Sequence, residues 1–263
     1  MTTEQSDRAD EISHLINLGE NVITFITSSI EILNRTYFAF HVSQSAEHFF
    51  SATSRLLGAV DGAHPEFMSL AGQVKTQADV LIKNIEEKPS WLDVPEGGFS
   101  LLHATQLIGI WGALECFVGD VFKASLKFRP ELLDGKPFEK ISLPVSLVAK
   151  GSDELYSTVY QKVLPPGSGQ IGKLEDVLNM VELGGPIDSE LKRKLLSAHQ
   201  IRNVWAHNSG VVDAHFMALC PYLGYKIGDI VNMTAAQYQS FAQAVIDYIS
   251  LILARINDRG FGQ

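Results

Sequence analysis

The residues of this chain whose chemistry stands out are Arg202, Asn203 and His207, near the end of a predicted helix. Arginine binds phosphate oxygens, asparagine positions groups by hydrogen bonding, and histidine transfers protons near neutral pH. At about 100° per residue, Asn203 and His207 share a helix face, whereas Arg202 lies well round from His207. The two would converge only if the helix frays at residues 208–210, if the long arginine side chain reaches, or if a second protomer contributes. A structural salt bridge and a helix-capping histidine are the plain alternatives.

The helix that carries these residues is predicted to run from Asp188 to His207. Asp188 is a good N-cap after the Gly-Gly-Pro segment, and Asn208-Ser-Gly supplies the stop. Arg202 falls in the middle of the apolar stripe of this helix, where an unpaired charge is costly. The stripe consists of Leu191, Leu195, Ala198 and Trp205.

A second long helix, predicted over residues 99–128, places an opposite charge in its own apolar stripe. Glu115 lies in the middle of that stripe. Two core-facing stripes that each contain one charge, of opposite sign, predict that Glu115 and Arg202 face each other where the helices pack. Glu115 is therefore the expected supporting residue of the site. Its stripe consists of Ile108, Trp111, Val118 and Phe122.

The chain as a whole is predicted to be all-α, because apolar residues recur at three- and four-residue spacing over most of its length. A run with prolines and glycines, residues 88–98, separates an N-terminal helical region (1–90) from a helical domain (99–257). Residues 222–231 indicate a small extended, hairpin-like insertion. Further helices are expected from residue 9, from Tyr37 to Leu57, from Pro65 through Ile85, over 153–163, around 174–180, for one or two turns over 213–219, and from Thr234 to Ile256.

The composition limits the classes of function. Of the 263 residues 46% are hydrophobic and 19% are charged, as in globular proteins. The net charge of −9 excludes a protein that binds long nucleic acid non-specifically, so any contact with RNA must be local. No secretory signal is recognisable, and the longest apolar stretch (99–122) contains His103, Glu115 and Asp120, which are costly in lipid. A cytoplasmic protein that does not span a membrane, with two reduced and buried cysteines, is expected.

A family resemblance adds to these observations. The segment Arg202-Asn203-Val204-Trp205-Ala206-His207 resembles the Arg-x(4–6)-His motif of HEPN ("higher eukaryotes and prokaryotes nucleotide-binding") domains, in which a polar residue directly after the arginine is typical. The resemblance covers roughly residues 99–257, whereas residues 1–90 resemble no family that we can name. Three further segments resemble HEPN members of the toxin and defence type. They are Ala113-Leu114-Glu115 in the first core helix, the segment 208–213 with Phe216, and Gly228-Asp229-Ile230 before the Thr234 helix.

The resemblance implies a HEPN-like helical bundle that acts as a homodimer and as a metal-independent endoribonuclease, in a toxin–antitoxin or phage-defence setting with an antitoxin or defence partner protein. His207 would transfer protons, Arg202 would bind the scissile phosphate of RNA, and Asn203 would position groups by hydrogen bonding. No metal or other cofactor is implied. The alternatives are a HEPN-like scaffold or binding module without catalysis, and a nucleotide-binding accessory subunit of a transferase.

Three other patterns do not predict a site of their own. The run Lys192-Arg193-Lys194 could add local positive potential for RNA, but an ordinary solvated charge run accounts for it. The segment 165–173 resembles a phosphate-binding loop only superficially, because no strand clearly precedes it and no Ser or Thr follows its lysine. A possible set of metal ligands matches no standard spacing and straddles a helix break. Its members are His207, Asp213, His215 and Cys220.

Overall fold

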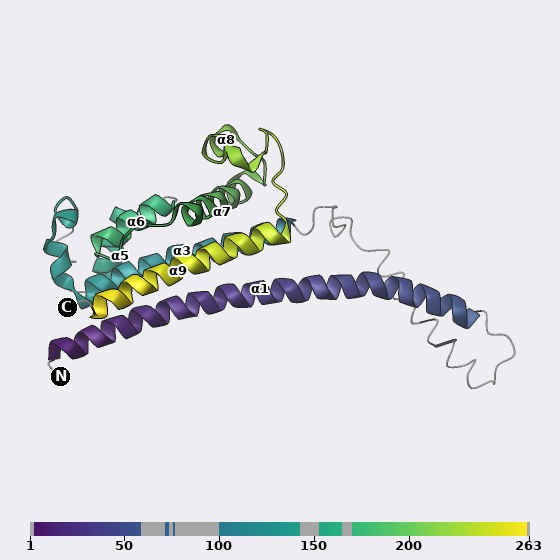
Figure 1. The fold of residues 1–263 in the computed structure, drawn as a ribbon, viewed down its shortest axis with the longest axis horizontal. Coiled ribbons are helices and arrows are strands. Elements are labelled where there is room, and N and C mark those ends of the chain that lie inside the picture. Colours follow the sequence, from purple (N-terminus) through teal and green to yellow (C-terminus); the bar gives the residue numbers. More distant parts are fainter. Residues whose placement is uncertain are drawn as a thin grey trace. The chain divides into compact units, whose positions relative to one another are not determined.

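A computed structural model of the chain describes residues 3–58, 72–73, 76, 100–142, 153–164 and 170–261. These residues are mostly helical, which confirms the predicted all-α class (Figure 1). The α-helices are α1 (Thr3–Gly58), α3 (Ser100–Phe128), α5 (Asp153–Val163), α6 (Ile171–Met180), α7 (Ser189–Asn208), α8 (Ala214–Leu219) and α9 (Ala235–Phe261). Short 3-10 turns are η2 (Pro130–Asp134), η3 (Lys136–Phe138) and η4 (Pro221–Leu223).

The chain divides into two compact units, one of Met1–Ser28 with Gly97–Gln263 and one of Ser29–Glu96. The predicted domain over residues 99–257 lies within the first unit. The two units divide the predicted region 1–90 within α1, whose first part, up to Ser28, belongs to the first unit. At Gly19 the backbone of α1 comes so close to α9 that an added Cβ would lie 2.5–2.9 Å from Leu253 side-chain carbons.

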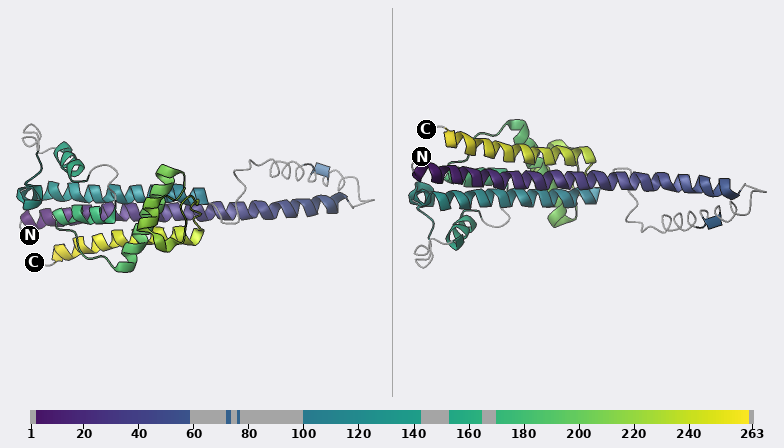
Figure 2. Two further views of the ribbon diagram at one scale, coloured as in Figure 1. Left: turned by 90° about the horizontal axis from the view of Figure 1, so that it is seen from above. Right: turned by 90° about the horizontal axis from the view of Figure 1, so that it is seen from below.

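Three helices form the centre of the first unit. The helices α3, α7 and α9 each contact the other two, and α5 and α6 pack on α3. Figure 2 shows α3 and α9 running alongside each other, with α7 lying across them. The largest fully buried side chains come mainly from this group, with Trp111 on α3 and Tyr238 and Tyr248 on α9 all at 0% exposure. The motif helix α7 is therefore positioned by two core helices.

By length and apolar composition, α3 is the one described helix that could cross a membrane. A buried core helix meets the same test, and α3 supplies many of the core side chains between Leu107 and Leu126. Among them, Leu107, Ile110, Leu114 and Val118 are each 0% exposed. These four side chains are part of the core of the bundle.

Two predicted elements differ from the structure. The segment expected to contain two helices, with the second starting near Tyr37, is the single helix α1, because no glycine or proline interrupts residues 20–57. The expected extended, hairpin-like insertion at residues 222–231 is not confirmed. Within the described residues, this segment contains η4 and one isolated antiparallel bridge between Val211 and Ile230, but no strand. The helix predicted from Pro65 through Ile85 lies largely outside the described residues.

Candidate functional site

The motif helix α7 is defined at both ends by local chemistry that the sequence predicted. The Asp188 carboxylate accepts hydrogen bonds from the backbone N–H groups of Glu190 (2.9 Å) and Leu191 (3.1 Å), so Asp188 is the N-cap. At the other end, Ser209 and Gly210 adopt the left-handed conformation, with φ of 51° and 82°. The Gly210 N–H then bonds the Val204 carbonyl at 3.0 Å, which closes the helix without fraying at Asn208.

The end of α7 is also tied to the loop that leads into α9. The Val231 N–H donates to the Gly210 carbonyl at 2.9 Å, and the Val212 N–H donates to the Asp229 carbonyl at 2.8 Å. The Ser100 hydroxyl at the start of α3 donates to the Val231 carbonyl (3.2 Å) and accepts from the Met233 N–H (2.8 Å). We call this set of bonds the Ser100 clasp. It joins the start of α3, the end of α7 and the start of α9.

The predicted contact between Glu115 and Arg202 is present. The Arg202 Nη2 and Glu115 Oε2 atoms are 3.6 Å apart, and the two side chains are 18% and 29% exposed. The Glu115 carboxylate also accepts a hydrogen bond of 3.1 Å from the Trp111 indole. Arg202 donates through Nη1 to the Asn203 side-chain oxygen at 2.9 Å, and its Nε is buried without a hydrogen-bond partner among the described residues. The guanidinium is therefore held in place yet still has unused donors.

A residue that the sequence analysis missed, His199, lies beside this pair. It is 3% exposed and packs against Trp111, with ring centroids 5.0 Å apart. The Asn203 amide nitrogen lies 3.3 and 3.4 Å from the two ring nitrogens of His199. Burial, and to a lesser extent the positive charges of Arg202 and His215, lower the pKa of His199 to about 4. The usable sequence signal was the four-residue spacing between His199 and Asn203 on one helix face.

His207 stands apart from this cluster. It is exposed in the last turn of α7, and within the described part of the chain it makes no hydrogen bond or ion pair. Five residues of helix separate its direction from that of Arg202 by about 140°. The structure thus brings together Glu115, Arg202 and Asn203, with His199, but it does not bring His207 of the same chain to Arg202.

Two side chains of the basic run on α7 share one carboxylate. Arg193 makes two hydrogen bonds to Glu190, of 2.9 and 2.8 Å, and Lys194 lies 3.9 Å from the same carboxylate. The Arg193 guanidinium also lies over the ring of Tyr222, 5.4 Å from its centroid. These contacts favour the interpretation of residues 192–194 as a surface charge run.

The remaining sequence patterns give no second reactive centre. No group of three or more potential metal ligands occurs among the residues that the structure describes, and these include His207, Asp213, His215 and Cys220. Cys220 is buried, and burial raises the pKa of its thiol. Cys116 is exposed, so the expectation of two buried thiols is wrong for this residue, which faces away from the core side of α3. Most of the glycine-containing loop before Gln170 lies outside the described residues.

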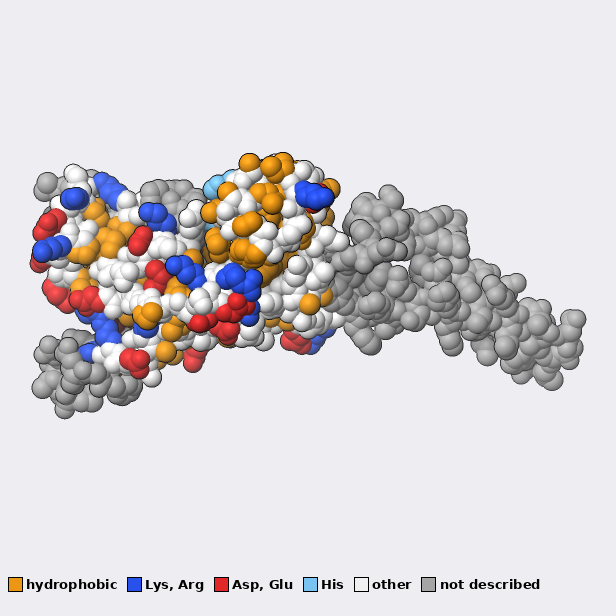
Figure 3. Space-filling model, turned by 45° about the horizontal axis from the view of Figure 1, so that its top comes forward, with side chains coloured by type: hydrophobic (Ala, Val, Ile, Leu, Met, Phe, Trp, Pro, Cys, Tyr) orange, Lys and Arg blue, Asp and Glu red, His pale blue; other side chains and the backbone are white. Residues whose placement is uncertain are grey.

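Apolar side chains gather on the surface over α8 and the loop that follows it (Figure 3). The largest of them are Tyr222, Ile227 and Ile230, which are 45%, 68% and 64% exposed. This surface follows the exposed end of α7 in the chain and is bonded to it through the bridge between Val211 and Ile230.

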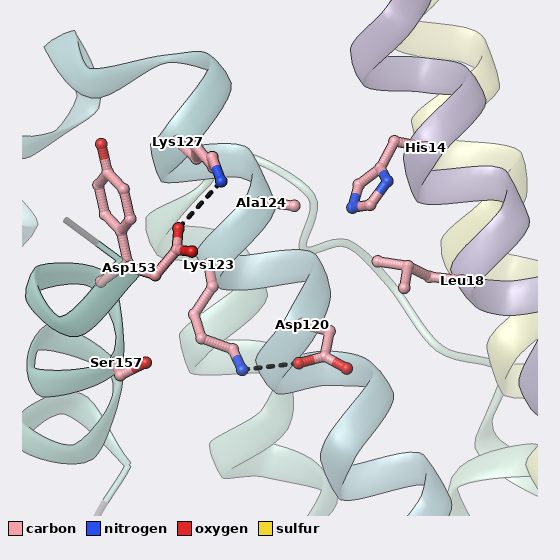
Figure 4. A pocket seen from close by; sticks show the side chains of 9 residues that line it. His14, Leu18, Asp120, Lys123, Ala124, Lys127, Asp153 and Ser157 are labelled. Carbon is pink, nitrogen blue, oxygen red and sulfur yellow. Dashed lines mark hydrogen bonds and ion pairs between the residues drawn. The ribbon is translucent and has the colours of Figure 1, made fainter. Parts of the chain in front are cut away.

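A pocket of about 290 Å³ lies elsewhere, between α1, α3 and α5 (Figure 4). His14 lines it from α1. From the opposite side, Lys123 pairs with Asp120 at 2.6 Å and Lys127 pairs with Asp153 at 2.9 Å. Each lysine is thus neutralised by a carboxylate, and none of the motif residues lines this pocket.

Comparison of the chain with family models, with curated proteins and with solved structures gave no match. The resemblance to HEPN domains therefore depends on the motif from Arg202 to His207 and on the order of the elements around it.

Proposed function

We propose that this chain is a metal-independent, HEPN-type endoribonuclease that acts as a homodimer, in the setting of a toxin or an anti-phage defence component in the cytoplasm. The observation that carries the proposal is that a held arginine and an exposed histidine lie on one well-capped helix. Arg202 is oriented by Glu115 and Asn203 and keeps unused donors, and His207 has no partner among the described residues.

The proposed reaction needs only these groups and the RNA. The 2′-hydroxyl of one nucleotide attacks the adjacent phosphorus while a neutral His207 accepts its proton. The P–O5′ bond breaks, and the leaving 5′-oxygen takes up a proton from a protonated His207, which is either the same residue or its copy in the partner protomer. The products are a 2′,3′-cyclic phosphate and a 5′-hydroxyl, so no oxidant, reductant or water is consumed. Arg202 stabilises the negative charge that develops on the phosphate oxygens.

The geometry of α7 explains why the proposal includes a dimer. The helix is intact through Asn208, so fraying does not turn His207 towards Arg202. The arginine side chain is directed to Glu115 and Asn203, so it does not extend round the helix. Of the three routes by which the two side chains could converge, a second protomer is the one that remains. The apolar surface of Tyr222, Ile227 and Ile230 beside the end of α7 would suit burial in such a contact.

A non-catalytic binding or scaffold module is the second candidate, and one observation favours it. The contact of Arg202 with Glu115 joins α7 to α3 inside the bundle, which is what a purely structural arginine does. In a module of this kind the motif would maintain the fold, and His207 would have no chemical role. A helical bundle does not by itself establish an activity.

The test is cleavage of RNA by the purified protein in EDTA, with analysis of the end groups. The variants Arg202→Ala and His207→Ala are compared with matched controls, Arg193→Ala on the exposed side of the same helix and His14→Ala on α1. The proposal predicts cyclic-phosphate ends from the parent and both controls, and a loss of at least about a hundredfold in each motif variant. Light scattering should give about twice the chain mass of 28.9 kDa.

Two results would overturn the proposal. Cleavage that persists in His207→Ala would exclude the motif as the catalytic centre. The second result is a folded dimer that cleaves neither total cellular RNA nor structured RNA and does not arrest growth when overexpressed. It would support the binding module instead. In that case Arg202→Ala should lower the melting temperature, whereas His207→Ala should leave it unchanged.

A further inference from the structure

His199 lies one helical turn before Asn203 and is enclosed by the core. Its ring is 3% exposed and packs against Trp111 of α3. Its polar contacts are with amide groups of its own helix, Asn203 and Gln200, whose side-chain nitrogen is 3.2 Å from the His199 Nδ1 atom. The buried ring of His199 therefore contacts Asn203, the polar residue of the motif.

The orientation of the Asn203 amide is fixed by Arg202. A guanidinium has donors and no acceptor, so the Asn203 oxygen must be the atom that faces it, at 2.9 Å. The NH₂ end of the same amide therefore faces His199, and its nitrogen lies 3.3 and 3.4 Å from the ring nitrogens. The NH₂ group only donates, and its nearly equal distances to the two ring nitrogens place it against the ring between them. A neutral, electron-rich ring accepts such a donor, whereas a positively charged ring repels it.

The charged and titratable groups around His199 favour the neutral ring. Arg202 on the same helix and His215 on α8 are both cationic neighbours when charged, and burial acts in the same direction. The carboxylate that approaches the cluster from α3, Glu115, is engaged by Arg202 and by the Trp111 indole. The ring therefore has burial and two positive neighbours against its protonation.

We propose that His199 is a positioning residue whose neutral ring holds the Asn203 amide, so that its oxygen fixes the Arg202 guanidinium in the orientation needed to bind an anionic phosphate. This inference deepens the proposed ribonuclease function and rests on it for the identity of the phosphate. The contacts that run from His199 through Asn203 to Arg202 are independent of that function. His199 does not touch the substrate in this arrangement, so it is not a catalytic residue.

The experiment has a structural arm and an activity arm. In the structural arm, NMR follows the ring carbon of His199 and the Nε–H of Arg202 during a pH titration of the wild type and of Asn203→Asp, and the Arg202 signals are also recorded in His199→Phe. The carboxylate introduced by this substitution accepts hydrogen bonds where the amide donates, and it adds a negative charge beside the ring. The ring pKa should therefore rise by at least about one unit in the variant. In the wild type the His199 signal should stay that of the neutral ring throughout the range of about pH 6–8.

In the activity arm, RNA cleavage is measured for His199→Gln, which keeps an acceptor, and for His199→Phe, which keeps only the ring shape. We expect kcat to fall roughly tenfold in His199→Phe, the effect of one hydrogen bond, and to be largely restored in His199→Gln. His14→Gln on α1 is the control. Equal losses in the Phe and Gln variants, at matched melting temperature, would show a role in packing alone and would overturn the inference.

The two arms separate failure of the inference from failure of the proposed function. If the wild type cleaves no RNA, the NMR arm still decides whether His199 positions Arg202. A His199 ring that titrates near its ordinary pKa of about 6.5, with Arg202 signals unchanged in His199→Phe, would overturn the positioning role. Cleavage by the wild type together with that result would leave the ribonuclease proposal standing without His199.

Discussion

Replacement of Glu115 by glutamine removes one charge from the pair that joins α3 and α7 and leaves the shape almost unchanged. The Trp111 indole can still donate to the glutamine oxygen, so the loss concerns mainly the attraction to Arg202. At 3.6 Å the gross Coulomb attraction is about 4–5 kcal/mol for an effective dielectric of about 20. The side chains are 29% and 18% exposed, so water recovers part of this when the pair is broken.

The net cost should lie between the values for exposed and buried pairs, which are about 0–1 and about 3–5 kcal/mol. We expect a loss of about 1–2 kcal/mol for Glu115→Gln on this scale. In a chain of this size about 1 kcal/mol changes the melting temperature by about 2–4 °C, so thermal unfolding should occur about 2–8 °C lower. Circular dichroism in the far ultraviolet, repeated at high salt, measures this shift.

The matched control is Glu190→Gln, which breaks an exposed pair with Arg193 on α7. Its melting temperature should stay within about 1 °C of the wild type. The reasoning is refuted if Glu115→Gln melts at the same temperature as this control, or if Glu115→Gln and Arg202→Gln combine additively, because a direct pair must show coupling.

Three further predictions concern stability. Gly210→Ala should lower the free energy of unfolding in urea by about 1–3 kcal/mol, because Gly210 has a φ of 82° and a Cβ there would lie 2.9–3.1 Å from the Trp205 ring; an unchanged value would contradict this conformation. Gly19→Val should lower it by about 1–3 kcal/mol by separating α1 from Leu253, and an unchanged urea midpoint would refute that close approach. As the pH falls from about 6.5 towards 4, His199 takes up a proton in the unfolded chain but stays neutral in the folded protein, because burial lowers its pKa. The free energy of unfolding of the wild type should therefore drop by on the order of 2–3 kcal/mol more than that of His199→Phe, and parallel curves of unfolding free energy against pH would contradict the lowered pKa.

Much of the motif helix could be predicted because its determinants are local. The Asp188 cap and the stop at Ser209-Gly210 depend on residues within one turn of each other, as does the capping box of Thr234 and Gln237 at the start of α9. The contact between Glu115 and Arg202 followed from the periodicity of two helices, since each placed one charge in an apolar stripe. The buried face of α7 differs from the apolar stripe that was predicted. Ile201 is 0% exposed, and Arg202 lies at the edge of the buried face.

The parts of the fold and the site that could not be predicted depend on contacts between elements that are far apart in the sequence. The four-residue spacing to Asn203 was the sequence signal at His199, but the packing of Trp111 from α3 on its ring depends on the tertiary structure. The segment 222–231 has strand-like residues, yet it bonds to the end of α7 through scattered backbone contacts and forms no hairpin. In contrast, the continuity of α1 could have been predicted, since no glycine or proline occurs between residues 20 and 57.

The Ser100 clasp has a consequence for the order of events during synthesis and folding. Its bonds link Ser100 to Val231 and Met233, across 131 and 133 residues of chain. At about 5–20 residues per second, a ribosome needs several seconds to more than about twenty to make the intervening segment. Contacts that close so long a loop form late. The motif helix, whose caps are local, can form early, but its end is tied to the segment before α9 only among the last steps, once that segment has been made.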